Sequence, residues 1–120
     1  QASYGFLYNW IAASNNGATN SSSLVRGACP RGWHLPTQAE LSTLSSNIES
    51  YYSTFSPKYA GYYYQGSSNL FNSYYFGMWS STASSGTDNY YHFYYNNSHS
   101  HGVSYSNGGD YGRTVRCIQD

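Results

Sequence analysis

Charged residues are scarce in this chain of 120 residues. They make up only 8% of it, as five basic and five acidic side chains, against roughly 25% in an average soluble domain. Neither sign clusters along the chain, so the sequence lacks the basic patch that nucleic acid or anionic lipid would require. No apolar run approaches the roughly 20 residues of a membrane span. We therefore expect no nucleic-acid partner and no direct membrane insertion of this domain.

Cysteine is also rare, with Cys29 and Cys117 as its only two examples. They lack the CxxC spacing and the neighbouring histidines of a zinc site. Two uses stay open at this stage. A disulfide would close a loop of nearly ninety residues, stabilise the fold by about 4.5 kcal/mol and imply an oxidising compartment. The alternative is a pair of buried free thiols.

The length fits a single domain spanning residues 1–120. The chain begins at Gln1 without an initiator Met or a signal-peptide pattern. We expect a domain excised from a larger surface or tail-fibre protein.

Sequence patterns predict one helix and several short strands. Residues 4–13 mix aromatic and branched side chains and predict a first strand. Thr37 and Glu40 form a capping box, and an apolar stripe of Leu41, Leu44 and Ile48 predicts a helix from Gln38 to about Glu49. Short aromatic segments separated by Gly, Ser and Asn then predict strands near residues 59–66, 72–82, 90–97, 102–106 and 113–118. The expected fold class is α+β, with one or two helices packed on short, mostly antiparallel strands with long loops.

Three motifs, CPRGWHLPTQAEL, GMWSST and the terminal GRTVRCIQD, resemble the Fibrobacter succinogenes major paralogous domain. The opening YGFLYNW fits the same pattern. That family of bacterial surface proteins has a C-type-lectin-like fold. The chain is also similar to the lectin-like variable proteins of diversity-generating retroelements and, more distantly, to formylglycine-generating enzyme.

The resemblance implies roles for scaffold residues. Trp33 and Trp79 would be core rings, and a disulfide between Cys29 and Cys117 would tie the ends of the domain. The remaining scaffold residues would form hydrogen bonds: Ser80, Ser81 and Arg116. The chain departs from the family pattern at residues 62–64, where three tyrosines stand in place of Tyr, Arg, Asn.

Motifs for metal-dependent or enzymatic chemistry are missing. Calcium-dependent lectins use EPN-, QPD- and WND-like motifs, which this sequence lacks, and Asp88 and Asp110 are isolated residues of predicted turns. Formylglycine-generating enzyme acts through a reactive cysteine pair, whereas only Cys117 lies in the C-terminal half here. We expect no enzymatic activity and no cofactor.

The histidines are weak candidates for a metal site. His99 and His101 would share a strand face and, with His92, could hold zinc or nickel. Exposed imidazoles without a metal are the favoured reading, so no metal is expected. His34 is expected to be structural, because no nucleophile or carboxylate is visibly paired with it.

Residues 84–111 have a restricted alphabet. Apart from Phe93 and Val103 they are Ser, Asn, Tyr, Gly, His, Thr or Asp. Changing the two adenines of the asparagine codons AAC or AAT reaches all of these residue types but never Lys, Glu, Gln, Met or Trp, and those five are absent here. Adenine-directed hypermutation by a retroelement would leave this pattern, although the family's own preference for Tyr and Asn would contribute to it.

Tyrosine with Ser, Gly and Asn is also the composition of antibody paratopes, where rigid rings supply contact area at low entropic cost. Strand alternation predicts that Phe93 points to the core with Tyr91 and Tyr95 and that the intervening residues point outward. The alternative is that the outward tyrosines only cover the sheet. The candidate ligand-binding residues are Tyr63, Tyr64, Asn72, Tyr74, Tyr75, Tyr90, His92, Tyr94, Asn97, His99, His101 and Tyr105.

Three functions stay open. The first is a non-enzymatic binding module, diversified by a retroelement, that recognises a protein or glycan ligand on another cell or host surface. The second is a calcium-independent carbohydrate-binding adhesin, and the third is a structural surface domain without a dedicated ligand. All three place the domain outside the cell, on a bacterial surface or in a phage tail fibre.

Overall fold

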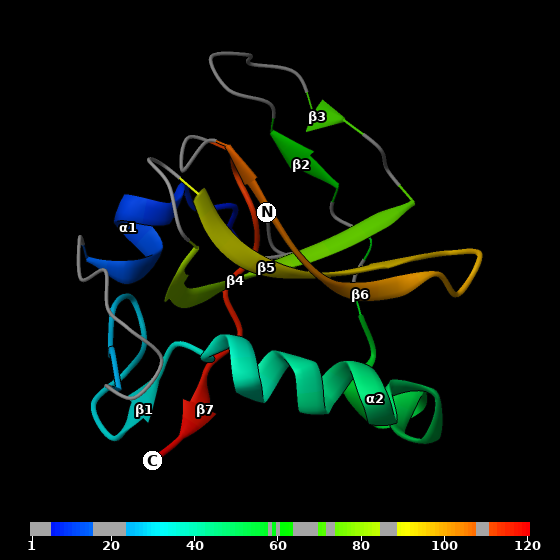
Figure 1. Ribbon diagram of the computed structural model, residues 1–120, viewed down its shortest axis with the longest axis horizontal. Coiled ribbons are helices and arrows are strands. Elements are labelled where there is room, and N and C mark those ends of the chain that lie inside the picture. Colours follow the sequence, from blue (N-terminus) through cyan, green and yellow to red (C-terminus); the bar gives the residue numbers. More distant parts are fainter. Residues whose placement is uncertain are drawn as a thin grey trace.

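The protein has an α+β fold, shown as a computed structural model in Figure 1. The structure describes residues 6–15, 24–57, 59, 61–63, 70–71, 74–84, 89–107 and 111–120. Within these ranges the elements are, in chain order, α1 (Trp10–Ser14), β1 (Trp33–His34), α2 (Gln38–Phe55), β2 (Tyr62–Tyr63), β3 (Leu70–Phe71), β4 (Tyr75–Ala83), β5 (Asn89–Asn96), β6 (His101–Asn107) and β7 (Ile118–Gln119). The predicted α+β class is confirmed, and the strand pairs among these elements are antiparallel.

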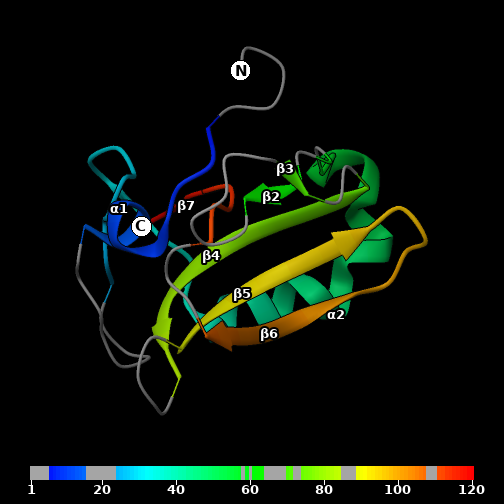
Figure 2. The same ribbon diagram turned by 90° about the horizontal axis from the view of Figure 1, so that it is seen from above.

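The central sheet has the order β4-β5-β6, and α2 covers one of its faces. The small β2–β3 pair stands on the opposite side of this sheet (Figures 1 and 2). Phe93 in β5 lies opposite Met78 in β4 and Val103 in β6. Because side chains alternate along a strand, this register decides which tyrosines face α2 and which face away.

The helix α2 begins as predicted and ends later than predicted. Thr37 and Glu40 form the expected capping box, and Leu41 and Ile48 are buried against the sheet. The helix continues past a kink at Tyr51 to Phe55. Tertiary packing accounts for the extra turns, because the Phe55 ring meets the rings of Phe76 and Phe93 edge-on, at 5.5 and 6.0 Å between centroids. No helix in the described part of the chain is long and apolar enough to cross a membrane.

The strand predicted for residues 4–13 is wrong for the residues that the structure describes. Tyr8 forms only an isolated bridge with Arg113, and Trp10–Ser14 is a short helix, α1. The Asn9 side chain caps this helix by accepting a hydrogen bond from the Ala12 amide (2.8 Å). Sequence alone favoured a strand because aromatic and branched residues prefer pleated surfaces.

A second apolar cluster lies on the face of the sheet away from α2. Trp10, Leu35 and Trp79 are fully buried in it. The predicted core position of Trp79 is confirmed. Trp33 is 39% exposed, so its predicted core position is wrong: it stands in β1, a strand of two residues paired only with β7.

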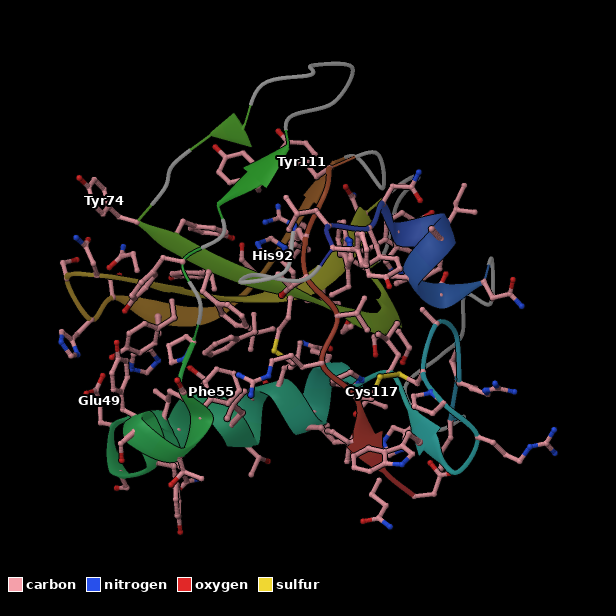
Figure 3. All side chains as sticks on the ribbon, turned by 180° about the vertical axis from the view of Figure 1, so that it is seen from behind. Glu49, Phe55, Tyr74, His92, Tyr111 and Cys117 are labelled. Carbon is pink, nitrogen blue, oxygen red and sulfur yellow. A yellow bond between two sulfur atoms is a disulfide. The ribbon has the colours of Figure 1, made fainter. Side chains whose placement is uncertain are left out.

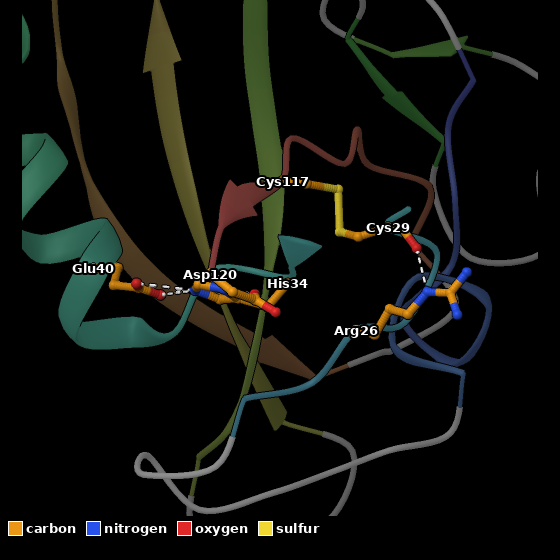
Figure 4. Close-up of a disulfide and its surroundings, with 6 residues drawn as sticks. All are labelled: Arg26, Cys29, His34, Glu40, Cys117 and Asp120. Atoms are coloured by element: carbon orange, nitrogen blue, oxygen red, sulfur yellow. Dashed lines mark hydrogen bonds and ion pairs between the residues drawn. A yellow bond between two sulfur atoms is a disulfide. The ribbon is translucent and has the colours of Figure 1, made fainter. Parts of the chain in front are cut away.

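The disulfide between Cys29 and Cys117 is formed, across 88 residues of sequence (Figure 4). Close to it, the buried His34 ring bonds the carboxylates of Glu40 (3.0 Å) and Asp120 (2.8 Å). These contacts support the expected structural role of His34, although the ring does have carboxylate partners that the sequence did not reveal. Together they fasten the C-terminus to the start of α2.

The predicted scaffold hydrogen bonds are present in two of three cases. Ser80 Oγ accepts from the Thr82 amide (3.1 Å). Arg116 Nη1 donates to the Phe55 carbonyl (2.6 Å). The hydroxyl of Ser81 is buried without a hydrogen-bond partner, so its predicted side-chain role is wrong.

Candidate functional site

The candidate site lies on the face of the central sheet that points away from α2. Along β4, Tyr75, Gly77 and Trp79 point to this face, while the alternate residues pack on α2. In the register of the sheet Tyr94 lies between Gly77 and Gly102. Small residues therefore flank the Tyr94 ring on both neighbouring strands.

Both glycines make room for rings that lie close to the sheet. A Cβ built on Gly77 would lie 2.7 Å from Cε1 of Tyr75, and one on Gly102 would lie 3.1 Å from the Tyr94 hydroxyl. The Tyr75 and Tyr94 rings are nearly parallel, at 7° between planes and 6.5 Å between centroids. The backbone of β4, β5 and β6 thus fixes the height and orientation of these two rings.

Two further tyrosines extend the ring surface. Tyr62 meets Tyr75 edge-on at 5.3 Å between centroids, and Tyr111 stacks on Tyr62 at 5.9 Å. All these rings are partly exposed. We call the group of Tyr62, Tyr75, Tyr94 and Tyr111 the tyrosine face.

The side chain of Arg113 lies within the tyrosine face. Its Nη1 donates to the Tyr75 hydroxyl at 2.8 Å. Burial raises the pKa of Tyr75, although the charge and the hydrogen bond of Arg113 oppose this shift. Burial also lowers the pKa of Arg113 from its ordinary value, against the opposing effect of the surrounding phenols. The tyrosine face therefore surrounds the buried Arg113 guanidinium with phenol rings.

His92 was predicted to be an exposed ligand residue, and this prediction is wrong. His92 does point to the face away from α2, but it is only 6% exposed and its ring meets Trp79 edge-on. In Figure 3, His92 lies below Tyr111, closer to the strands of the central sheet. Burial and the Arg113 charge lower the pKa of His92 to about 3, so the ring is neutral and cannot serve as an exposed contact residue.

The predicted free ring of Tyr90 is wrong as well. Tyr90 packs against the cluster of Trp10 and Trp79 and stacks flat on the Trp10 indole. Tyr95 is fully buried on the α2 side, as predicted. Tyr91 remains partly exposed there and meets Tyr105 edge-on at 5.4 Å.

His99, in the β5–β6 turn, and His101, at the start of β6, lie on the α2 side and not on the face of Tyr94. The Tyr95 hydroxyl bonds Glu49 Oε1 (2.9 Å) and His99 Nδ1 (2.6 Å). His101 stacks on the Tyr95 ring and bonds Ser45. Among the described residues, no group of three His, Cys, Asp or Glu side chains could hold a metal ion. These contacts instead fasten the hairpin to α2.

The remaining predicted residues are spread more widely. Tyr74 and Tyr105 are 63% and 55% exposed, and Asn97 is exposed in the β5–β6 turn. Tyr74 points away from the sheet in Figure 3. Tyr63 is in β2 and its side chain is not described, while Tyr64 and Asn72 lie outside the described residues. Of the predicted residues with described side chains, the structure brings only Tyr75 and Tyr94 together on the tyrosine face.

Three members of the site were not predicted as ligand residues: Tyr62, Tyr111 and Arg113. Tyr62 belongs to the tyrosine run of residues 62–64 that the sequence marked as different from the family pattern, but the sequence gave no orientation for its ring. Arg113 carried one available signal, as one of only five basic residues in the chain, next to a tyrosine-rich segment. Its approach to β4, through a parallel bridge between Met78 and Thr114, could not be derived from local patterns.

A separate pocket of about 530 Å³ lies between the end of α2 and the C-terminal segment. Phe6, Phe55 and Arg116 are among its lining residues, and the Arg116 guanidinium lies 4.1 Å from the centre of the Phe55 ring. None of the predicted ligand residues with described side chains lines this pocket.

Comparisons with known proteins found no relative of this chain. No family model, no curated protein and no solved structure matches the chain.

Proposed function

We propose that this domain is a non-enzymatic binding module that uses the tyrosine face to recognise a protein or a receptor on a cell surface. In this proposal the scaffold is C-type-lectin-like, and the variable residues are diversified by a retroelement. The domain acts outside the cell, on a bacterial surface or in a phage tail fibre. The disulfide is compatible with such an oxidising compartment.

The observation that carries the proposal is the pair of parallel rings, Tyr75 and Tyr94, held over Gly77 and Gly102. Their backbone belongs to a regular sheet, and both rings are partly exposed. Binding costs less when the contact side chains are already ordered, because less rotamer entropy is lost. Partly exposed, ordered rings are the kind of anchor that recognition surfaces use.

The test is binding of the labelled domain to intact bacterial cells and to a glycan array, with tyrosine-to-alanine variants. Tyr94→Ala should abolish binding while leaving the melting temperature nearly unchanged. Tyr51→Ala is the matched control, because Tyr51 is a 59% exposed tyrosine on α2. Equal loss of binding in both variants, or loss only where the fold is lost, would contradict the proposal. Consistent glycan binding by several natural variants of the domain would favour a carbohydrate-binding adhesin instead.

The proposed origin has its own test in the gene. Codons ending in C or T at the variable positions, beside an adenine-rich near-copy and a reverse transcriptase gene, would support retroelement diversification. Purine-ending codons at those positions would contradict it.

A further inference from the structure

The backbone of Arg113 is held firmly at the edge of the site. Its amide and carbonyl exchange hydrogen bonds with Tyr8, at 2.9 and 2.7 Å, and the following residue, Thr114, bonds the Gly77 carbonyl through its amide (3.0 Å). The Arg113 side chain therefore leaves a fixed point beside β4. It extends over the face that carries the tyrosines.

Aromatic rings surround the guanidinium of Arg113. Its central carbon lies 5.1 Å from the ring centre of Trp79, 5.2 Å from that of Tyr111, 5.7 Å from that of Tyr62 and 6.0 Å from that of Tyr75. Cation–π attraction to these rings offsets part of the cost of removing the charge from water. It does not supply the hydrogen-bond acceptors that a guanidinium requires.

The hydrogen bonding of Arg113 is incomplete. The residue is 4% exposed, and its Nε is buried without any hydrogen-bond partner. Within the described part of the chain, Nη1 donates to the neutral Tyr75 hydroxyl. No carboxylate of the described residues forms an ion pair with Arg113. A buried cation in a folded protein is ordinarily paired, so the lack of a carboxylate partner for Arg113 among the described residues calls for a physical reason.

We propose that Arg113 is the anion-binding centre of the site and that it pairs with a carboxylate group of the ligand. The inference rests on the proposed function of the tyrosine face and names the chemistry of what that face binds. A planar carboxylate can accept from the unpaired Nε edge of the guanidinium, while the Tyr75 hydroxyl keeps Nη1 in place. The flat rings on either side favour a planar acidic group over a bulkier anion.

Arg113 is 4% exposed, so the proposal requires a covering side chain to move before a ligand reaches it. The rings that cover it belong to Tyr62, Tyr75 and Tyr111, which are all partly exposed. In this proposal, rotation of one such ring opens a path to the Nε edge. Gly77 is needed for this arrangement, since a Cβ there would lie 2.7 Å from Tyr75 Cε1 and 3.3 Å from Arg113 Nη1.

The neutral state of His92 is consistent with an anion site that depends on a single cation. His92 lies in β5, and its pKa is lowered by burial and by the Arg113 charge. A second positive charge next to Arg113 would raise the free-energy cost of burying unpaired charge when no ligand is bound. The neutral His92 imidazole is therefore a polar group beside Arg113 that adds no charge.

The test follows the Arg113 Nε–H and Trp79 Nε1–H resonances of the folded domain by nuclear magnetic resonance. The probes are acetate and glucuronate, with glucose and inorganic phosphate as comparison solutes at constant ionic strength. Both carboxylates should produce saturable shifts at these two groups, and glucose should produce none. Absence of a saturable shift with either carboxylate overturns the inference, and a response to phosphate alone overturns the assignment of a carboxylate.

Variants separate charge from donor geometry. Arg113→Lys keeps a cation but removes the Nε edge, so glucuronate affinity, followed at the Trp79 Nε1–H resonance, should fall by about tenfold or more. Arg31→Gln, at an exposed arginine, should leave it unchanged. Dispersed resonances and an unchanged melting temperature would show that Arg113→Lys is folded. Unaltered affinity in this folded variant would overturn the inference.

The two proposals can fail independently. Loss of cell binding in Tyr94→Ala with no carboxylate response at Arg113 would retain the binding module and remove only the anion site. A carboxylate response in a domain whose cell and glycan binding does not depend on Tyr94 would remove the proposed function of the tyrosine face.

Discussion

The indole of Trp10 lies flat on the phenol ring of Tyr90, with 3.8 Å between ring centroids and 10° between planes. Trp10 is 1% exposed and its Nε1 donates to the Ser80 carbonyl (2.9 Å). The tyrosine-rich strand β5 therefore serves two purposes. Tyr90 completes a core, whereas Tyr94 on the same face lies over a glycine and remains available.

Replacing Tyr90 with alanine should destabilise the fold. Removing a ring that packs on a buried indole costs about 2 to 3 kcal/mol of unfolding free energy, somewhat below the cost for a fully buried aromatic side chain. Tyr74→Ala is the control, because a 63% exposed ring should change stability by less than about 0.5 kcal/mol. Urea unfolding followed by tryptophan fluorescence measures both. Similar stabilities of the two variants would show that Tyr90 is not part of the core.

The hydroxyl of Tyr95 should contribute to the stability of the fold, whereas the hydroxyl of Tyr94 should not. Burial, together with Glu49, raises the pKa of Tyr95, so its hydroxyl stays protonated and can donate to that carboxylate. Tyr95→Phe should lower the unfolding free energy by about 1 to 2 kcal/mol. Tyr94→Phe is the matched control, since the structure shows no hydrogen-bond partner for the Tyr94 hydroxyl among the described residues. The same denaturation midpoint for both variants would contradict this role.

Local patterns predicted local features well. The capping box at Thr37 and the apolar stripe of Leu41 and Ile48 depend on residues close in sequence, and both are confirmed. The end of α2 was predicted too early, because Phe55 is held by rings of β4 and β5 that no local pattern reveals.

The candidate site was harder to predict for the same reason. Strand alternation could not show that the rings of Tyr75 and Tyr94 lie next to each other. It also treated every outward residue of β5 as exposed. Whether an outward ring is covered depends on segments distant in sequence: Trp10 of α1 stacks on Tyr90, and Trp79 of β4 meets the His92 ring. Tertiary packing therefore separated contact residues from core residues on one strand face.

Reduction of the disulfide should destabilise the domain strongly. Cys29 and Cys117 close a loop with a sequence separation of 88, and the chain-entropy model gives a loss of about 4.5 kcal/mol when such a loop is opened. The doubly substituted Cys29→Ser, Cys117→Ser protein should show this loss in urea unfolding, with no further effect of reductant. An unchanged stability would mean that the β1–β7 pairing and the His34 contacts hold the ends together without the sulfur bridge.

The His34 contacts should make stability depend on pH in the neutral range. Burial lowers the pKa of His34, but the hydrogen bonds and charges of Asp120 and Glu40 outweigh this and raise it above 6.5. The folded protein therefore binds the proton more tightly than the unfolded chain. The stabilisation is fully present below the unfolded pKa and is lost as the pH rises through the folded pKa.

A His34→Gln variant should lack this dependence. The difference in unfolding free energy between wild type and variant should shrink as the pH rises from about 6 to about 9. Below this range Glu40 adds a dependence of opposite sign, because its hydrogen bonds from Thr37 and His34 outweigh burial and lower its pKa below 4.5. Parallel stability curves for the two proteins across the neutral range would show that the His34 proton is not linked to folding.

His92 should govern the acid limb of the stability curve. Burial and the Arg113 charge lower its pKa from 6.5 to about 3 in the folded state, so the unfolded chain binds the proton more tightly. Stability is therefore lost as the pH falls from 6.5 toward 3, by on the order of 5 kcal/mol. A His92→Gln variant, neutral at every pH, should have a flatter acid limb in urea unfolding between these values, even if it is less stable at pH 7. If wild type and variant lose stability at the same rate on acidification, the imidazole must be able to take up a proton inside the fold, and the electrostatic description of the tyrosine face would have to change with it.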